Sequence, residues 1–251
     1  MTTTGASMLN DGAGMRAAQC VFLLWCSLSS HAFAETDFST VETAALDKGL
    51  TAEGWQLLQK RGVPATLFSE PESGVILIRS NASNALIYRA VEPHESSQSV
   101  LTWSWRVDEI EANGDIIAGG QPDWPVAVYA AFAVDKAYVS WWRRFVNRIK
   151  FNAIGLPDSG KIITYVWQAS SIESGAKEIY PNPYLPNTGM IFDLQSGSGV
   201  ADWRSERRDL FADFTEAFGH PAESLIYLAI SADSEDTGRS SSARLRHITT
   251  E

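Results

Sequence analysis

Short apolar segments separated by turn-forming residues constrain the fold of this chain more than any other feature. Leu101–Val107 alternates strictly between apolar and polar residues, which is typical of a strand with one buried face. Trp103 and Trp105 share the apolar side, so we expect both in the core. The predicted strands are Val75–Arg79, Ala85–Val91, Leu101–Val107, Val126–Val134, Lys161–Gln168, Met190–Gln195, Leu225–Ser231 and Ala243–Thr249.

Most gaps between these strands are too short to hold the helix that a parallel connection requires. The sequence therefore predicts an all-β fold: an antiparallel β-sandwich of jelly-roll or galactose-binding-like type, with two accessory helices. The later helix has an apolar stripe and stops at Gly219, since glycine commonly ends helices. The stripe consists of Leu210, Phe211, Phe214, Ala217 and Phe218.

The earlier helix is predicted over Tyr138–Ala153, with an apolar stripe opposite a run of arginines. Two interpretations stay open. The helix could cover one end of the sandwich with its arginines in water. Alternatively, residues 138–149, which include Trp141 and Trp142, could contact a membrane surface as a basic amphipathic helix.

The amino-terminal segment has the pattern of a secretory signal. Arg16 precedes the apolar run Cys20–Leu28, and Ala32–Ala34 forms an A-x-A cleavage site. The run is shorter than the roughly 20 apolar residues that span a bilayer. We predict that residues 1–34 are an over-long start plus a signal peptide, that residues 35–251 form one β-sandwich domain, and that the protein is exported, with the periplasm as its destination. A lipoprotein modified at Cys26 is the less favoured alternative.

Charge and cysteine usage exclude several classes of partner. The chain has 20 Lys and Arg against 30 Asp and Glu, a net charge of −10, which argues against a nucleic-acid partner because that would require a basic face. Both cysteines, Cys20 and Cys26, lie within the predicted signal. We therefore expect no disulfide framework in the mature domain.

Several segments resemble, in the same order, a bacterial family known as domain of unknown function 3047. They are WSWRV, DWPVAVYAAF, YVWQ, NPY, WRSERRDLFADFTEAFG and ISADSEDTG. The resemblance runs from Trp55 to Thr249 and implies an exported bacterial β-rich domain, without an activity attached to it. The chain departs from the family pattern at Asp123-Trp124, where two adjacent acids are usual, and at Ala127, where an arginine is common.

No catalytic motif stands out. His94, His220 and His247 are scattered, and there is no nucleophile elbow or phosphate-binding glycine loop. A carbohydrate-active hydrolase or lyase needs only two suitably placed carboxylates, so this class stays open. The charged run around the late helix places Asp209 and Asp213 near basic residues. It fits either helix-surface ion pairs or a partly buried Arg–Asp clamp tying helix to sheet.

The acidic turn after Leu225–Ser231 is the candidate metal site. Asp233, Glu235 and Asp236 resemble the first half of an oxygen-rich calcium loop, but Arg244 stands where an EF-hand needs its bidentate glutamate. Calcium is thus the one cofactor that the sequence suggests. The competing interpretation is a tight turn in which Asp and Gly supply the geometry.

Aromatic residues beside planar polar residues suggest a sugar-binding face. Trp124, Trp167 and Tyr184 are the candidates for such exposed rings; the competing interpretation is ordinary packing beneath loops. The predicted function is an exported, non-catalytic binding domain for carbohydrate or envelope glycan; the alternatives are the carboxylate-dependent enzyme above and an envelope structural protein with a membrane-surface helix. The predicted ligand contacts are Asp123, Trp124, Arg106, Tyr165, Trp167 and Gln168.

Overall fold

The computed structural model describes residues 38–39, 46–60, 62–92, 94–110, 123–135, 160–169, 179–185, 187–197 and 202–251. All of them belong to one compact unit, Ala34–Glu251. The predicted signal segment 1–34 and the predicted helix 138–153 lie outside these residues. Within the described part of the chain, no helix is long and apolar enough to span a membrane.

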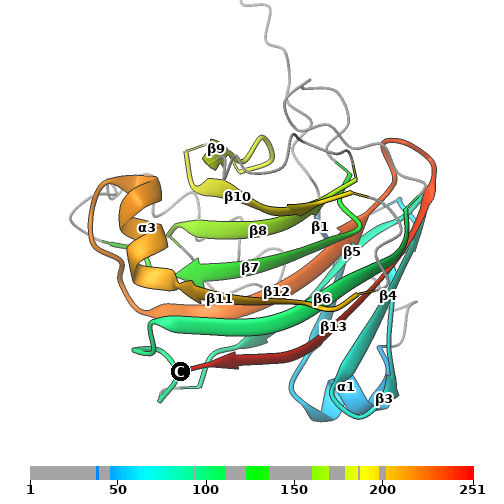
Figure 1. Ribbon diagram of the computed structural model, residues 1–251, viewed down its shortest axis with the longest axis horizontal. Helices are drawn as coiled ribbons and strands as arrows, with labels where there is room; N and C mark the ends of the chain where they lie inside the picture. The colour runs from blue at the N-terminus through cyan, green and yellow to red at the C-terminus, as the bar shows by residue number, and fades with distance from the viewer. Residues whose placement is uncertain are drawn as a thin grey trace, which may run out of the picture. The chain divides into compact units, whose positions relative to one another are not determined.

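The described chain forms two β-sheets that pack face to face (Figure 1). Sheet A has the order β1 (Phe38–Ser39), β2 (Gln56–Lys60), β5 (Asn84–Ala90), β12 (Leu225–Asp233), β7 (Val126–Phe132), β8 (Ile162–Gln168), β10 (Gly189–Ser196) and β9 (Ile179–Pro181). Sheet B has the order β11 (Arg204–Asp209), β6 (Val100–Ile110), β13 (Ser240–Thr250), β4 (Val75–Asn81) and β3 (Leu67–Glu72). The predicted β-sandwich is confirmed, and each predicted strand overlaps an observed one.

One pairing departs from the antiparallel rule. β8 and β10 run parallel, with Gly189 opposite Ile162 and Phe192 opposite Tyr165. Parallel neighbours need a crossover, and here the chain returns through the segment between Gln168 and Gly189, which includes β9. The other strand pairings in the described part of the chain are antiparallel.

The core between the sheets is rich in tryptophan. Trp103 and Trp105 on β6 are almost fully buried and meet edge to face, with ring centroids 5.4 Å apart. Across the sheets, Trp105 meets Trp167 at 5.7 Å and Trp103 meets Tyr165 at 5.3 Å. Such aromatic pairs add to the stabilisation from buried area, and the prediction that both Trp103 and Trp105 belong to the core is confirmed.

Two helices are described, α1 (Lys48–Ala52) and α3 (Leu210–Phe218). α3 matches the predicted apolar stripe and ends at Gly219, whose φ of 75° lies in the left-handed region that glycine adopts without strain. The expectation that Asp209 lies within this helix is wrong. Arg204–Asp209 form β11, because they pair with β6 from Trp105 to Val100, and Asp209 instead caps α3.

The alternation predicted for the last strand fails at one residue. His247 has a φ of 55°, and the register of β13 against β6 shifts between Arg246 and Thr249. A bulge of this kind reverses the faces of the residues beyond it. His247 is therefore exposed rather than inward, while Ile248 packs against the core.

Candidate functional site

The residues predicted to bind a ligand do not form one site, because the sheets separate them. Tyr165 and Trp167 point from β8 into the core, whereas Gln168 lies on the opposite face of the same strand, since neighbouring residues alternate. Arg106 lies on the outward face of sheet B. The six predicted contacts are thus divided among the core and the two outward faces.

Of the three candidates for exposed aromatic rings, the two tryptophans are buried. Trp167 is 1% exposed and Trp124 is 2% exposed, whereas Tyr184, at 37%, is exposed as predicted. Trp167 is inward because of its place in the strand alternation. Trp124 packs on the outward face of sheet A against Ala127, Val166 and Ile191.

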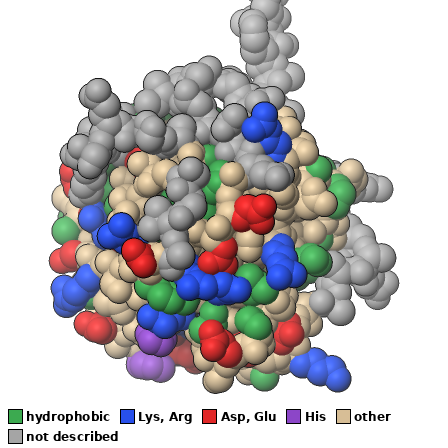
Figure 2. Space-filling model, turned by 45° about the vertical axis from the view of Figure 1, so that its right-hand side comes forward, with side chains coloured by type: hydrophobic (Ala, Val, Ile, Leu, Met, Phe, Trp, Pro, Cys, Tyr) green, Lys and Arg blue, Asp and Glu red, His purple; other side chains and the backbone are tan. Residues whose placement is uncertain are grey.

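Arg106 belongs to a chain of charges on sheet B. Its Nε lies 2.9 Å from Asp108, and the other oxygen of Asp108 lies 2.8 Å from Arg244. Trp203 meets both Arg106 and Arg246, whose guanidinium carbons lie 5.2 and 3.9 Å from its ring centroid. In the view of Figure 2, basic and acidic side chains are interspersed, with only small apolar areas between them.

Asp123, Trp124 and Gln168 lie instead near a second group of acids, on the outward face of sheet A. We call Asp123, Trp124, Tyr184, Asp233 and Asp236 the acidic corner. Asp233 Oδ1 accepts a hydrogen bond from the backbone N–H of Trp124 at 2.7 Å. The Tyr184 hydroxyl donates to Asp236 Oδ2 at 3.0 Å, and the Tyr184 ring meets Trp124 edge to face at 6.3 Å.

The corner is held together by the turn after β12. Asp123 Oδ2 accepts hydrogen bonds from the backbone N–H and the hydroxyl of Thr237, at 2.9 and 2.6 Å. This turn carries the residues predicted to bind calcium. In the described ranges, no group of three His, Cys, Asp or Glu side chains has the arrangement of a metal site. Of the three residues predicted to bind calcium, Asp233 accepts a hydrogen bond from the backbone N–H of Trp124 and Asp236 accepts one from the Tyr184 hydroxyl.

Electrostatics in the corner favour a protonated carboxyl group. Burial raises the pKa of Asp233 well above its usual value, and the nearby charges of Asp123, Glu235 and Asp236 raise it further, against the lowering effect of the Trp124 N–H. Burial and the carboxylates of Asp233, Asp236 and Asp123 also raise the pKa of Tyr184. A carboxyl group whose pKa is raised keeps its proton to a higher pH, and in its protonated form it can donate as well as accept a hydrogen bond.

Three polar atoms around the corner have no hydrogen-bond partner within the described part of the chain. They are Asp123 Oδ1, Trp124 Nε1 and Gln168 Nε2, and all three are buried. A buried polar group without a partner costs about 1–3 kcal/mol, and native structures contain few of them. The three residues were all predicted ligand contacts, so part of the predicted set does share one face.

Other polar residues of this face escaped the sequence analysis. The Tyr129 hydroxyl and Ser231 Oγ are 2.9 Å apart, and burial, followed by the charge of Asp233, raises the pKa of Tyr129. Asp193 on β10 is only 8% exposed and lies in the same row of the sheet as Ser231, through Ala127 and Val166. The sequence analysis missed Tyr129 because it lies in Val126–Val134, a segment that is apolar on both sides.

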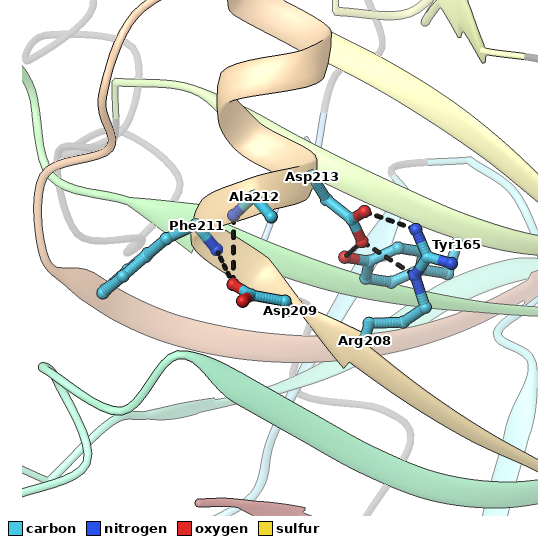
Figure 3. A network of polar contacts seen from close by, with 6 residues as sticks. All are labelled: Tyr165, Arg208, Asp209, Phe211, Ala212 and Asp213. Atoms are coloured by element: carbon cyan, nitrogen blue, oxygen red, sulfur yellow. Dashed lines mark hydrogen bonds and ion pairs between the residues drawn. The ribbon is translucent and has the colours of Figure 1, made fainter.

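A separate polar network lies between the sheets beside α3 (Figure 3). Asp213 Oδ2 accepts hydrogen bonds from the Tyr165 hydroxyl and from Arg208 Nε, each at 2.8 Å, and Asp213 Oδ1 accepts from Arg208 Nη2. Burial raises the pKa of Tyr165, and Asp213 raises it further. This is the predicted Arg–Asp clamp, with Arg208 on strand β11 rather than on the helix, and it assigns Tyr165 to the scaffold.

Asp209 completes this region. Its Oδ1 accepts hydrogen bonds from the N–H groups of Phe211 and Ala212 at 3.1 and 3.0 Å (Figure 3). An N-cap of this kind stabilises a helix by about 1 kcal/mol. Cap and clamp together fix α3 at the end of β11.

Solved structures that resemble this chain include a cellulase and a xyloglucanase domain. One is a thermostable cellulase derived from Cel12A of Rhodothermus marinus, with 12% identity, a TM-score of 0.43, and 86% of this chain and 96% of that chain covered. Another is the xyloglucanase domain of NopAA from Sinorhizobium fredii in complex with cellobiose, with 10% identity, a TM-score of 0.40, and 79% and 95% covered. Each is a likeness of architecture only.

No curated protein matches the chain. The family described as "Protein of unknown function (DUF3047)" matches residues 53–249, close to the extent of the resemblance found in the sequence. The chain therefore belongs to the DUF3047 family.

Proposed function

We propose that the protein is a carbohydrate-binding domain, and that the sugar binds at the acidic corner on the outward face of sheet A. Three unpartnered polar atoms around one aromatic pair support this proposal more than any other observation. Asp123 Oδ1 offers an acceptor, while Trp124 Nε1 and Gln168 Nε2 offer donors. Sugar hydroxyls supply both kinds of partner.

Tyr184 gives the site its entrance. It is the one large side chain of the corner that is exposed, and it covers the edge of Trp124. A rotation of Tyr184 away from Trp124 would expose an indole face on which the C–H surface of a sugar can stack, and the acceptors of Asp123 and Asp236 lie beside it. In this proposal, contact between the sugar and Trp124 requires the Tyr184 ring to rotate.

A glycan array followed by calorimetry with the tightest glycan tests the proposal. Tyr184→Ala is expected to weaken glycan binding at least tenfold, about 1.4 kcal/mol, because it removes the aromatic ring at the entrance. Gln168→Leu, which removes one donor with little change in volume, is expected to weaken binding several-fold. Leu67→Ala is the matched control, since Leu67 is 63% exposed on β3 of sheet B. No binding to any glycan, or equal losses in all three variants, would contradict the proposal.

A second candidate, glycoside hydrolysis, is favoured by one observation. Asp233, whose pKa is raised by burial, lies near Asp123, and glycoside hydrolysis requires a pair of carboxyl groups, one of which acts as the acid with a raised pKa. If the protein is a hydrolase, wild type releases reducing ends from the glycan that it binds, and Asp233→Asn abolishes release while retaining binding. Binding without release by wild type leaves the non-catalytic function.

The proposed location is outside the cytoplasm, as the amino-terminal pattern predicts. The processed protein is expected to begin at Glu35. Amino-terminal sequencing of protein recovered from the periplasmic fraction tests this, and a chain that keeps residues 1–34 would contradict it.

A further inference from the structure

The outward face of sheet B carries four arginines on three adjacent strands. They are Arg79 on β4, Arg244 and Arg246 on β13, and Arg106 on β6. Ala243 and Leu245 of β13 point into the core, so the residues between and after them point outward. We call these four arginines, with Trp203, the arginine face. In a protein with a net charge of −10, such a concentration of positive charge is unusual.

The positive charge of this face is only partly compensated. Arg106 lies directly opposite Arg244 in the sheet, and like charges so placed repel one another. Both make ion pairs with one carboxylate, Asp108. Glu109 is the other acid that the strand contributes, and it lies opposite Ser242.

The other two arginines have no acidic partner among the described residues. Neither Arg79 nor Arg246 forms an ion pair with any residue that the structure describes, and Arg246 Nε is buried without a hydrogen-bond partner there. Arg246 is fixed by stacking on Trp203, with its guanidinium carbon 3.9 Å from the ring centroid. The stacking orients a charged fork without neutralising it.

The spacing of these groups suits a chain of anions. Arg79 lies opposite Ser242 on the adjacent strand, four residues from Arg246, so the two positions are about 13 Å apart along the strands and about 5 Å apart across them. A guanidinium binds a carboxylate through two parallel hydrogen bonds. From the arrangement of these side chains we propose that the arginine face binds an acidic polysaccharide, with its carboxylates seated on Arg79 and Arg246.

Other polyanions fit this face less well. Nucleic acid has a much denser charge, about one per 1.7 Å of duplex, and the net charge of the protein would repel it. The indole ring that could stack on a base is already engaged by Arg106 and Arg246. An anionic membrane would favour a broad apolar area for insertion, and Leu67 on the edge strand is the one large apolar side chain of sheet B that is exposed among the described residues.

Electrophoresis of the full chain through gels that contain polygalacturonate tests the proposal. Retardation is expected in polygalacturonate and not in dextran, and it should weaken as salt is added because the contacts are ionic. The double variant Arg79→Gln, Arg246→Gln is expected to bind at least tenfold more weakly. Arg106 and Arg244 are left intact, so that Asp108 keeps its partners.

The matched control is Arg204→Gln with Arg207→Gln, which removes the same charge from exposed positions on the edge strand β11. Arg207 is already paired with Glu251. The affinity of this control variant for polygalacturonate should therefore stay within twofold of the wild-type value. Equal losses in the two double variants, or no retardation of wild type, would overturn the proposal. Equal retardation by single-stranded DNA, or capture by phosphatidylserine vesicles without retardation by polygalacturonate, would overturn it in favour of those ligands.

This face is independent of the acidic corner, which lies on the other sheet. Tyr184→Ala should therefore leave retardation by polygalacturonate unchanged. Conversely, the double variant of Arg79 and Arg246 should leave the binding of neutral glycans unchanged.

Discussion

The clamp beside α3 and the acidic corner contain the same kinds of residue with opposite electrostatics. In the clamp, Asp213 accepts hydrogen bonds from Tyr165 and from the guanidinium of Arg208. In the corner, Asp233 accepts one backbone N–H and lies near three other acids. The two sites differ in how far their carboxylates are paired. The clamp pairs its carboxylate with a guanidinium and holds the fold, whereas the corner contains polar atoms without a hydrogen-bond partner among the described residues.

The largest predicted effect tests the clamp. Asp213→Asn is expected to lower the free energy of unfolding by about 3–5 kcal/mol, because it leaves the half-buried guanidinium of Arg208 without its counter-charge. Urea denaturation measures the change. Glu223→Gln, at an exposed position, is the control and should change stability by less than about 0.5 kcal/mol. If Asp213→Asn leaves the free energy of unfolding unchanged, the clamp does not hold the fold.

Tyr165→Phe tests the same network more gently. It removes one hydrogen bond to a charged group, so the expected loss is about 2 kcal/mol, smaller than that of Asp213→Asn because the Arg208–Asp213 pair stays. The same denaturation experiment measures it. Glycan affinity should not change, and a selective loss of affinity would return Tyr165 to the binding site.

Asp233→Asn should raise the free energy of unfolding, whereas the two clamp variants should lower it. The pKa of Asp233 is raised on folding, so the folded chain holds its proton more tightly than the unfolded chain. The stability associated with this group is fully present below its unfolded pKa, near 3.9, and is lost as pH rises through the folded value. At pH 7 the variant is therefore expected to be more stable by about 1 kcal/mol, and its stability should depend less on pH. A variant less stable than wild type at pH 7 would contradict this.

The smallest predicted effect concerns the hydroxyl of Tyr184. Tyr184→Phe removes an exposed hydrogen bond to Asp236 and keeps the ring, so stability should change by less than about 0.5 kcal/mol. Calorimetry should find a smaller loss of glycan affinity than for Tyr184→Ala. Equal losses would show that the hydroxyl, rather than the ring, makes the contact.

Sequence patterns predicted the sandwich because alternation and short gaps are local features. Every predicted strand was found, including the Trp103–Trp105 strand. β11 was missed because its residues are mostly charged and adjoin a real helix, so that only pairing with β6 reveals it as a strand. The parallel pairing of β8 with β10 depends on contacts distant in sequence and could not be inferred from periodicity.

The candidate site was predicted less completely. The sequence identified Asp123, Trp124 and Gln168, but grouped them with Tyr165 and Trp167, which the strand alternation turns inward. It missed Tyr129 and Asp193, because a tyrosine or a single acid in an apolar strand gives no signal of the face on which it lies.

The order of strands has a consequence for synthesis of the chain. β12 lies between β5 and β7 in sheet A, and β13 lies between β4 and β6 in sheet B, so the last two strands occupy central places in both sheets. A nascent chain that has not yet emerged from the ribosome beyond Leu225 can form neither sheet completely. We expect folding to be post-translational, and chains truncated before β12 to be recognised by proteases or chaperones as unfolded.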